Sequence, residues 1–303
     1  TYFADALKRI TNGKYNLFNN NHLKNNPVTF PMYISLQRGE SLNFEDAGGG
    51  TIGRNFFINK LATETNNKNA AWYGKEFCRK FWSDPFDIIW AKTTVEPEAP
   101  KTPSIHFRSI DWWVMRSEFL NSEKVVVAGK AGMNNDPHHG HLDIGQFIVR
   151  WRDEYYISEL GKMFYDEQYF DDARWEYPFA SSEGHNVLFV NGELQIPGKL
   201  RRQPWNYNVG GKVLDFRTSE KRDYVLMDPT NAYPKKELKS WKRHILLEKP
   251  YITVVLDEVK SSVGAEIEAR FHSECKIEVK EKFTLLKGKQ GTMALIPFTE
   301  NGF

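Results

Sequence analysis

The hydrophobic pattern of this chain changes its period once, at a proline-rich stretch near residue 100. Ahead of that stretch, residues 55–62 and 70–82 carry apolar side chains at helical spacing. Beyond it, apolar and polar residues alternate, which is the period of a strand. Three prolines within 93–103 indicate a linker. A chain of 303 residues fits about two domains, so we expect an α+β chain with helices over 1–97 and strands over 104–303.

The second part predicts a series of short strands separated by turn residues. Asn191-Gly192 is a strong hairpin signal and predicts that 187–190 pairs with 193–196. Many short strands joined by turns are typical of an antiparallel β-sandwich. The expected strands are 104–109, 112–116, 124–129, 146–152, 154–159, 186–190, 213–219, 223–227, 240–247, 251–259 and 266–273.

The first residues predict a helix that is already under way, with Phe3, Leu7 and Ile10 on one apolar face. We therefore expect this chain to be the C-terminal part of a longer protein. No signal peptide is visible at Thr1, and no apolar run approaches the ~20 residues of a membrane span. The two cysteines lie in different halves and predict no disulfide framework.

The charge of the chain limits its partners. Lys and Arg number 41 and Asp and Glu 39, a net charge of +2. This is too small to favour nucleic acid, although it permits an anionic ligand. Aromatic residues make up 14% of the chain. That content is common in carbohydrate-binding proteins, whose rings pack on sugar faces, and also in ordinary hydrophobic cores.

Histidines and aspartates are concentrated in residues 136–143, directly before an apolar strand. On an extended segment, His139, His141 and Asp143 would lie on one side. This suits a metal site, a proton-transfer site or both, and a plain polar loop is the alternative. His141 with Glu159 and His185, taken from separate strands, would form a common zinc shell. His141-x-Asp143 with His185 also imitates the facial triad of a non-haem iron oxygenase.

Three ordered motifs resemble the signatures of the heparinase II/III-like polysaccharide lyases. The resemblance is strongest over 104–200. Its first motif departs from the family at Gln146, where a serine is usual, and its second has Glu159 where aspartate is frequent. The motifs are Asn135-x-x-His138-His139-Gly140-His141-x-Asp143-x-Gly145-x-Phe147, then Glu159-x-Gly161 with Tyr165, then Gly184-His185-Asn186 with Gln195.

The resemblance implies a fold and a reaction. Residues 1–97 would be the C-terminal helices of an (α/α) toroid, and 104–303 the antiparallel β-sandwich that follows it. The implied reaction is β-elimination of a uronic-acid polysaccharide, with heparan sulfate or heparin expected first and alginate next. The family's principal acid/base tyrosine comes from upstream toroid helices, and no match to it occurs before residue 100.

The resemblance also implies roles for individual residues. His139 is expected to be catalytic. His141, Glu159 and His185 are expected to hold a structural Zn²⁺, with Ca²⁺ the less favoured ion. A non-catalytic carbohydrate-binding or structural module of the same fold is the main alternative, but such a module would need no His139. The expected partner is an acidic polysaccharide, and the expected location is the bacterial periplasm or the exterior.

Further candidates come from the residues between and after the motifs. Tyr165, Tyr169 and Tyr177 lie between the motifs, and Tyr169 is the candidate chosen for catalysis. A basic patch with an aromatic neighbour predicts contacts to sulfate or carboxylate groups, with a solvated loop as the alternative. This patch consists of Lys199, Arg201, Arg202 and Trp205, and Arg174 with Trp175 forms a similar pair.

Overall fold

The computed structural model divides the chain into two compact units. Unit 1 comprises Thr1–Leu42 and Gly49–Pro103, and unit 2 comprises Asn43–Gly48 and Ser104–Phe303. The stretch 93–103 contains no helix or strand. The short segment Asn43–Gly48 belongs to unit 2 although it interrupts unit 1 in the sequence. The described residues are 1–37, 39–50, 55–78, 85–134, 139–198, 204, 206–236, 238–262 and 264–298.

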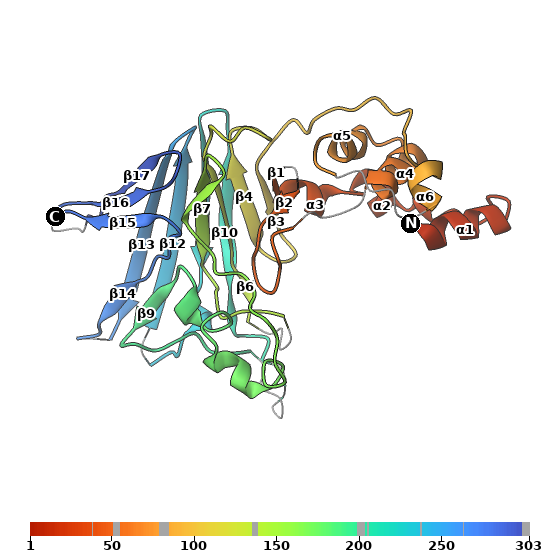
Figure 1. The fold of residues 1–303 in the computed structure, drawn as a ribbon. Helices are drawn as coiled ribbons and strands as arrows, with labels where there is room; N and C mark the ends of the chain where they lie inside the picture. The colour runs from red at the N-terminus through yellow and green to blue at the C-terminus, as the bar shows by residue number, and fades with distance from the viewer. Residues whose placement is uncertain are drawn as a thin grey trace. The chain divides into compact units, whose positions relative to one another are not determined.

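Unit 1 is mainly helical in its described part (Figure 1). The expected helix at 55–62 corresponds to α4. The one expected at 70–82 corresponds to α5, which ends at Glu76, and 79–82 lie outside the described residues. The side chain of Asn67 caps α5 by accepting a hydrogen bond from the backbone N–H of Ala70 at 2.8 Å. The elements are α1 (Tyr2–Ile10), α2 (Asn21–Asn25), α3 (Thr29–Ile34), β1 (Ser35–Gln37), β2 (Glu40–Ser41), α4 (Asn55–Thr65), α5 (Lys68–Glu76) and α6 (Pro85–Ile89).

Helix α1 forms as expected, but its apolar face is not buried. Phe3 is 71% exposed and Ile10 is 83% exposed, whereas Asp5 is buried. Asp5 lies at the contact with α4 and forms an ion pair with Lys60 at 2.6 Å. The expected helix is thus confirmed, and within unit 1 it is held in part by charged side chains.

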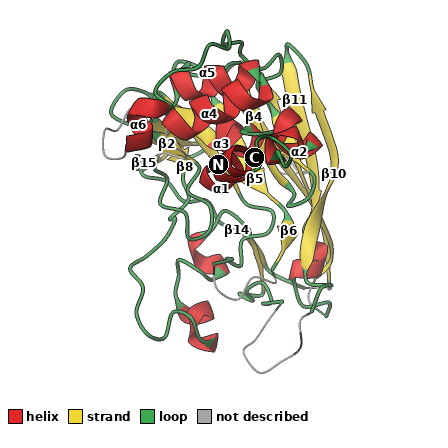
Figure 2. Ribbon diagram, turned by 90° about the vertical axis from the view of Figure 1, so that its right-hand side faces the viewer, coloured by secondary structure: helices red, strands yellow, loops and turns green. Residues whose placement is uncertain are grey.

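Unit 2 contains two five-stranded sheets, and their pairings are antiparallel (Figures 1 and 2). The long strands β10 and β11 run side by side in one of them. One sheet has the order β13 (Ile252–Ser261), β12 (Leu238–Glu248), β11 (Arg222–Asp228), β10 (Gly210–Thr218), β6 (Gly132–Met133); the other has the order β3 (Ile105–Phe107), β4 (Trp112–Arg116), β5 (Val126–Lys130), β7 (Phe147–Trp151), β8 (Glu154–Ile157).

Side chains from both large sheets form one hydrophobic core. Trp113 of β4 and Phe147 of β7 belong to the same buried cluster as Trp241 and Ile245 of β12. Strand β12 alternates between buried and partly exposed positions, as the period of two requires. Strand β7 is buried at every position except Trp151, which is partly exposed. The polar loops at its two ends are consequently anchored to a rigid interior strand.

The predicted hairpin is only partly present. Asn191 and Gly192 have φ angles of 53° and 74°, as a tight turn requires, and Val190 bridges to Glu193. The turn is thus confirmed, but 193–196 forms no strand. Strand β9 (Leu188–Val190) pairs instead with β14 (Ile267–Ala269). A further three-stranded sheet consists of β15 (Lys276–Val279), β16 (Thr284–Lys287) and β17 (Thr292–Leu295).

The fold is therefore mixed, with a helical unit and a unit of antiparallel sheets. No helix in the described part of the chain is both long enough and apolar enough to cross a membrane.

Candidate metal and catalytic site

The loop 139–146 carries the first motif and leads into β7. The expectation that His139, His141 and Asp143 lie on one side of an extended segment holds only in part. They lie in a loop ahead of the strand, which begins at Phe147. His139 is exposed in this loop, whereas His141 and Asp143 are buried. The three side chains therefore enter different environments.

A glycine is required where this loop turns toward β7. Gly145 has a φ of 91°, which side chains rarely adopt. A Cβ atom there would lie 2.8 Å from the ring of Trp241 and 2.7 Å from Pro229. Close packing as well as backbone conformation thus explains Gly145 in the first motif.

His141, Glu159 and His185 come together in the interior of unit 2. All three are buried, and each offers a ligand atom within 4.8 Å of the other two. The ring centroids of the two histidines are 5.1 Å apart. His141 precedes β7, Glu159 follows β8 and His185 precedes β9. The residues that the sequence nominated as metal ligands thus form one cluster at the ends of three strands.

The hydrogen bonds of these residues leave one nitrogen of each imidazole unpaired. His141 Nε2 bonds to Asp46 at 3.1 Å, and His185 Nδ1 bonds to Glu159 at 3.0 Å. His141 Nδ1 and His185 Nε2 are buried and have no hydrogen-bond partner among the described residues. Buried polar atoms are normally paired. Two unpaired imidazole nitrogens beside a carboxylate are a donor set that zinc accepts, so these residues fit the ion.

The two histidines have opposite pKa shifts. Burial disfavours the charged form of His141 and lowers its pKa, despite the hydrogen bond to Asp46. Burial acts in the same direction on His185, but the charge and hydrogen bond of Glu159 outweigh it and raise its pKa. His141 is thus a neutral ligand candidate, whereas a protonated His185 must release the proton on Nε2 before that nitrogen can bind an ion.

Asp46 is the residue of this site that the sequence analysis missed. It lies in the Asn43–Gly48 segment of unit 2. Its carboxylate accepts hydrogen bonds from His139 Nδ1 at 2.9 Å, His141 Nε2 at 3.1 Å and the Tyr169 hydroxyl at 2.6 Å. Burial alone would raise the pKa of Asp46, but these bonds and the charge of Arg174 hold it far below its usual range.

Arg174 is not part of a solvated loop, as that alternative supposed, because it is fully buried. Its guanidinium donates to Asp46 at 3.3 Å and to the carbonyl of Gly140 at 3.0 Å. It also lies 4.2 Å from the centre of the Tyr169 ring. Arg174 neutralises the buried carboxylate and ties it to the backbone between His139 and His141.

Tyr169, the candidate for catalysis, is also fully buried. Its hydroxyl donates to Asp46, and burial together with that hydrogen bond raises its pKa. A tyrosine in this state is held in its protonated form. The geometry favours a supporting role for Tyr169, while the neighbouring Tyr165 is 45% exposed.

Asp143 takes part in a different arrangement. It pairs with the buried Lys130 at 2.8 Å and accepts from Gln146 at 2.9 Å. It is not among the residues whose ligand atoms gather with His141 and His185. Its carboxylate is engaged by a lysine, which counts against the iron triad that the sequence left open. Gln146, which stands where the family usually has serine, serves here to orient Asp143.

Two buried amides of the third motif support the loops around the cluster. Asn186 donates to the carbonyls of Phe147 at 2.8 Å and Ser158 at 2.7 Å. Gln195 accepts from the N–H of Ile144 at 2.9 Å and donates to its carbonyl at 2.8 Å. These side chains satisfy backbone groups at the first residue of β7 and in the loops next to it. Their hydrogen bonds connect the third motif to Ile144 and Phe147 of the first motif.

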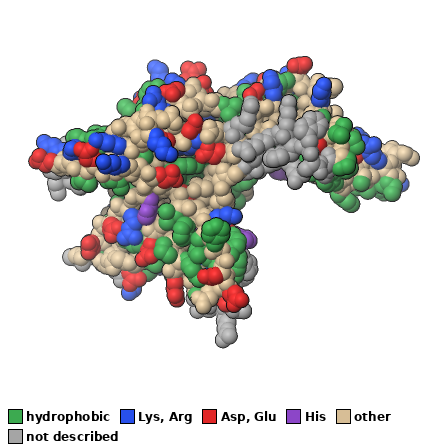
Figure 3. All heavy atoms as spheres, in the orientation of Figure 1, with side chains coloured by type: hydrophobic (Ala, Val, Ile, Leu, Met, Phe, Trp, Pro, Cys, Tyr) green, Lys and Arg blue, Asp and Glu red, His purple; other side chains and the backbone are tan. Residues whose placement is uncertain are grey.

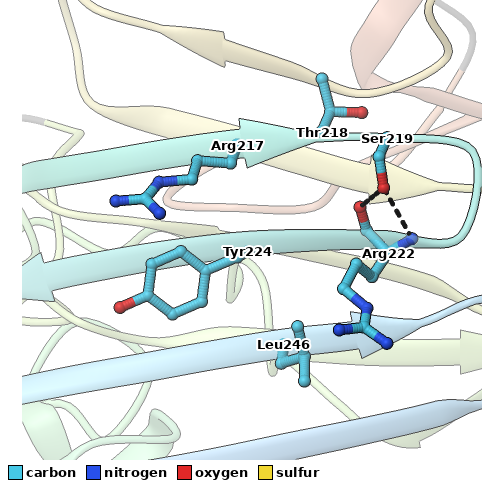
Figure 4. A pocket seen from close by; sticks show the side chains of 6 residues that line it. All are labelled: Arg217, Thr218, Ser219, Arg222, Tyr224 and Leu246. Carbon is cyan, nitrogen blue, oxygen red and sulfur yellow. Dashed lines mark hydrogen bonds between the residues drawn. The ribbon is translucent and has the colours of Figure 1, made fainter.

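The predicted substrate contacts Arg201, Arg202 and Trp205 lie outside the described residues. A pocket of about 360 Å³ occurs elsewhere, on strands β10 to β12 (Figure 4). Its side chains include Arg217 and Arg222, which pair with Asp215 and Glu248. The charges in this pocket are therefore already compensated, and it shares no residue with the histidine cluster.

Partly exposed aromatic residues border the accessible histidine. Phe170 is 40% exposed and Tyr165 is 45% exposed. Phe170 lies 6.1 Å from the His139 ring and 4.9 Å from the Tyr165 ring, measured between centroids. The space-filling view shows hydrophobic side chains gathered at the lower end of unit 2, with acidic side chains beside them (Figure 3). Phe170 and Tyr165 thus form a small, partly exposed aromatic surface beside His139.

The fold and the site together define a class of protein. It has antiparallel sheets, a buried His–His–Glu cluster and an accessible histidine beside an aromatic surface. Residues 99–301 match the family model of the heparinase II/III-like C-terminal domain. The chain therefore belongs to the heparinase II/III-like family. No curated protein matches the chain.

Solved structures of lyases share this fold. The heparan sulfate lyase HepC from Pedobacter heparinus has a TM-score of 0.70 at 15% identity, covering 98% of this chain and 42% of that one. A heparinase III structure has a TM-score of 0.62 at 14% identity, covering 86% and 38%. The heparinase III BT4657 gene product has a TM-score of 0.61 at 14% identity, covering 85% and 36%. This chain thus spans about two-fifths of the length of these proteins.

Proposed function

We propose that this chain is part of a lyase that cleaves a uronic-acid-containing glycosaminoglycan by β-elimination. The observation that carries the proposal is His139, whose side chain is 60% exposed. A hydrogen bond of 2.9 Å to Asp46 fixes the orientation of its ring. The ring lies beside Phe170, and Asp46 also bonds to His141 of the buried cluster of candidate metal ligands. A structural loop has no need of an accessible histidine held by a buried carboxylate.

The reaction requires three events at one sugar unit. The uronate carboxylate must be neutralised, the weakly acidic C5 proton removed and the leaving glycosidic oxygen protonated. His139 donates from Nδ1 to Asp46, so its Nε2 is the basic nitrogen of the neutral ring. In this proposal the His139 ring contacts the uronate and either neutralises its carboxylate or transfers a proton. Exposed Tyr165 is the nearer tyrosine to a bound sugar, because Tyr169 is buried.

The wider architecture forms part of the same proposal. Unit 1 would be the end of an (α/α) toroid, and unit 2 a β-sandwich. The principal acid/base tyrosine would belong to toroid helices outside this chain. Heparan sulfate or heparin is the substrate we favour, because the HepC structure with this fold is described as a heparan sulfate lyase. Such polymers occur outside the cytoplasm, so we place the protein in the periplasm or the exterior.

The expected result of the direct test is specific. The chain is incubated with heparan sulfate, heparin, chondroitin sulfate, hyaluronan and alginate, and the ultraviolet absorbance of unsaturated uronate ends is followed. We expect a rise with heparan sulfate or heparin. Bound polymer without a rise for any substrate, even after the upstream toroid of a relative is supplied in a fusion, would favour the binding module instead.

We also propose that His141, Glu159 and His185 hold a structural Zn²⁺. The ion would stabilise the loop that carries His139 and would supply positive charge to the interior. Protein stripped with chelator is expected to bind one zinc ion and to gain thermal stability. Affinity should fall as the pH drops below the raised pKa of His185, because its proton then competes with the metal.

Calorimetric titration at several pH values measures this zinc binding. Glu159→Gln, which keeps the shape of the side chain and removes its charge, should weaken binding. Glu193→Gln at an exposed position provides a matched control. Equal affinity in both variants would remove Glu159 from the ligand set.

A further inference from the structure

We propose that Asp46 is a positioning residue that sets the tautomers of His139 and His141 together. Through one carboxylate it would prepare His141 for the metal and His139 for the substrate. The role of His139 toward the substrate rests on the proposed function. The tautomer of His141 does not depend on that function. Nothing in the sequence motifs names Asp46, which lies more than ninety residues from both histidines.

The two oxygens of the carboxylate divide between the two histidines. Oδ2 lies 2.9 Å from His139 Nδ1, and Oδ1 lies 3.1 Å from His141 Nε2. The side chain of Asp46 is only 5% exposed, so water does not compete strongly for these oxygens. Each histidine is therefore held by its own oxygen of a single rigid group.

An ionised carboxylate only accepts hydrogen bonds, which decides the tautomers. His141 must carry its proton on Nε2, and its Nδ1 is then the basic nitrogen. That same Nδ1 is the buried atom without a hydrogen-bond partner. His139 must likewise carry its proton on Nδ1. A carboxylate that fixes the ring and raises its basicity is a common partner of a metal-ligating histidine.

Arg174 and Tyr169 keep this carboxylate in place. Arg174 donates to both oxygens at 3.3 Å and to the Gly140 carbonyl at 3.0 Å. Tyr169 donates to Oδ1 at 2.6 Å. Gly140 separates the two histidines in the chain, so the clamp holds the backbone as well as both rings. Occupation of the metal site would thereby be transmitted through His141 and Asp46 to His139.

The first test is the tautomer itself. Long-range proton–nitrogen correlation spectra of histidine-labelled protein report which ring nitrogen carries the proton. We expect His141 protonated on Nε2 and His139 on Nδ1 in the wild type. In Asp46→Asn at least one assignment should change or become mixed, because the side chain then offers one oxygen and one NH2 group. The ring that faces the NH2 group must accept a hydrogen bond instead of donating one. Unchanged tautomers in this variant would overturn the proposal, whatever the activity of the chain.

The second test is zinc affinity, measured by chelator competition. Asp46→Asn is expected to weaken zinc binding by roughly 10–100-fold, as loss of a carboxylate behind a histidine ligand does elsewhere. If the lyase reaction is established, kcat should fall more than KM changes. Glu220→Gln removes one exposed charge and is the matched control. Wild-type zinc affinity in Asp46→Asn would contradict the proposed role.

A second variant guards against a folding defect. Asp46→Asn leaves the buried Arg174 without its counter-charge, which can itself destabilise the loop. The pair Asp46→Asn with Arg174→Gln removes both charges. If Asp46 sets the tautomers, the double variant regains thermal stability but not zinc affinity. Recovery of both would show that Asp46 serves only to balance Arg174, and would overturn the inference.

Discussion

Replacing His139 by alanine is expected to lower polysaccharide turnover by about 10²–10⁴-fold, the usual contribution of a positioned acid or base. Zinc binding and thermal stability should change little. The side chain is 60% exposed, and its Nδ1 bonds at 2.9 Å to a carboxylate that His141 and Tyr169 also hold. Its removal therefore leaves the buried cluster intact.

The measurement compares kcat, zinc content and melting temperature of His139→Ala with those of the wild type. His22→Ala in unit 1 is the matched control, since this residue is exposed in α2. Where this chain lacks activity by itself, the comparison is made in a fusion with the upstream toroid of a relative. Loss of zinc in His139→Ala would show that the roles of the two histidines in the motif are exchanged. Unchanged turnover with zinc retained would leave His139 without a role in catalysis.

Replacing Arg243 by methionine is expected to destabilise unit 2 by about 3–5 kcal/mol, the usual effect of removing one partner of a buried ion pair. Arg243 is fully buried in β12. It binds both oxygens of Asp257, at 2.8 and 2.9 Å. It also donates to the carbonyls of Gly145 at 3.0 Å and Asn186 at 2.6 Å.

The loss should extend to the metal site, because Gly145 and Asn186 lie in the two motifs that bear the histidines. Zinc affinity of Arg243→Met should therefore fall together with its melting temperature, although Arg243 is not a ligand candidate. Arg270→Met is the control, because Arg270 pairs with the half-exposed Glu268. A pair of that kind contributes about 0–1 kcal/mol. If both substitutions lowered the melting temperature and the zinc affinity equally, Arg243 would have no special role in holding Gly145 and Asn186.

Much of the fold follows from local pattern. The period of two predicted β4 at its observed bounds, Trp112–Arg116, and β12 to within a few residues. The Asn191-Gly192 turn was predicted correctly, but its second strand was not. Strand β9 pairs with β14 instead, a partner more than seventy residues away. Pairing over such a distance depends on which edges meet in space, and local alternation carries no information about that.

The grouping of His141, Glu159 and His185 was predictable because histidine and carboxylate side chains are ligand types that zinc accepts. The three residues are indeed together in the structure. Asp143 was less predictable. It satisfies the same chemical criterion, but Lys130 reaches it in the folded protein and pairs with it.

The sequence therefore determined which residues are candidates for the site, because hydrophobic period and ligand type are properties of short segments. The partners of those residues were decided by the folded chain. No sequence pattern distinguishes Asp46 from the other acidic residues. Its position at the site follows from the folded chain, in which the segment Asn43–Gly48 belongs to unit 2. The sequence around Arg174 is compatible with a surface position. In the folded protein Arg174 is buried and forms an ion pair with Asp46. Hydrogen bonds and ion pairs between distant residues depend on distances in space, and these exist only once both sheets and their loops have packed.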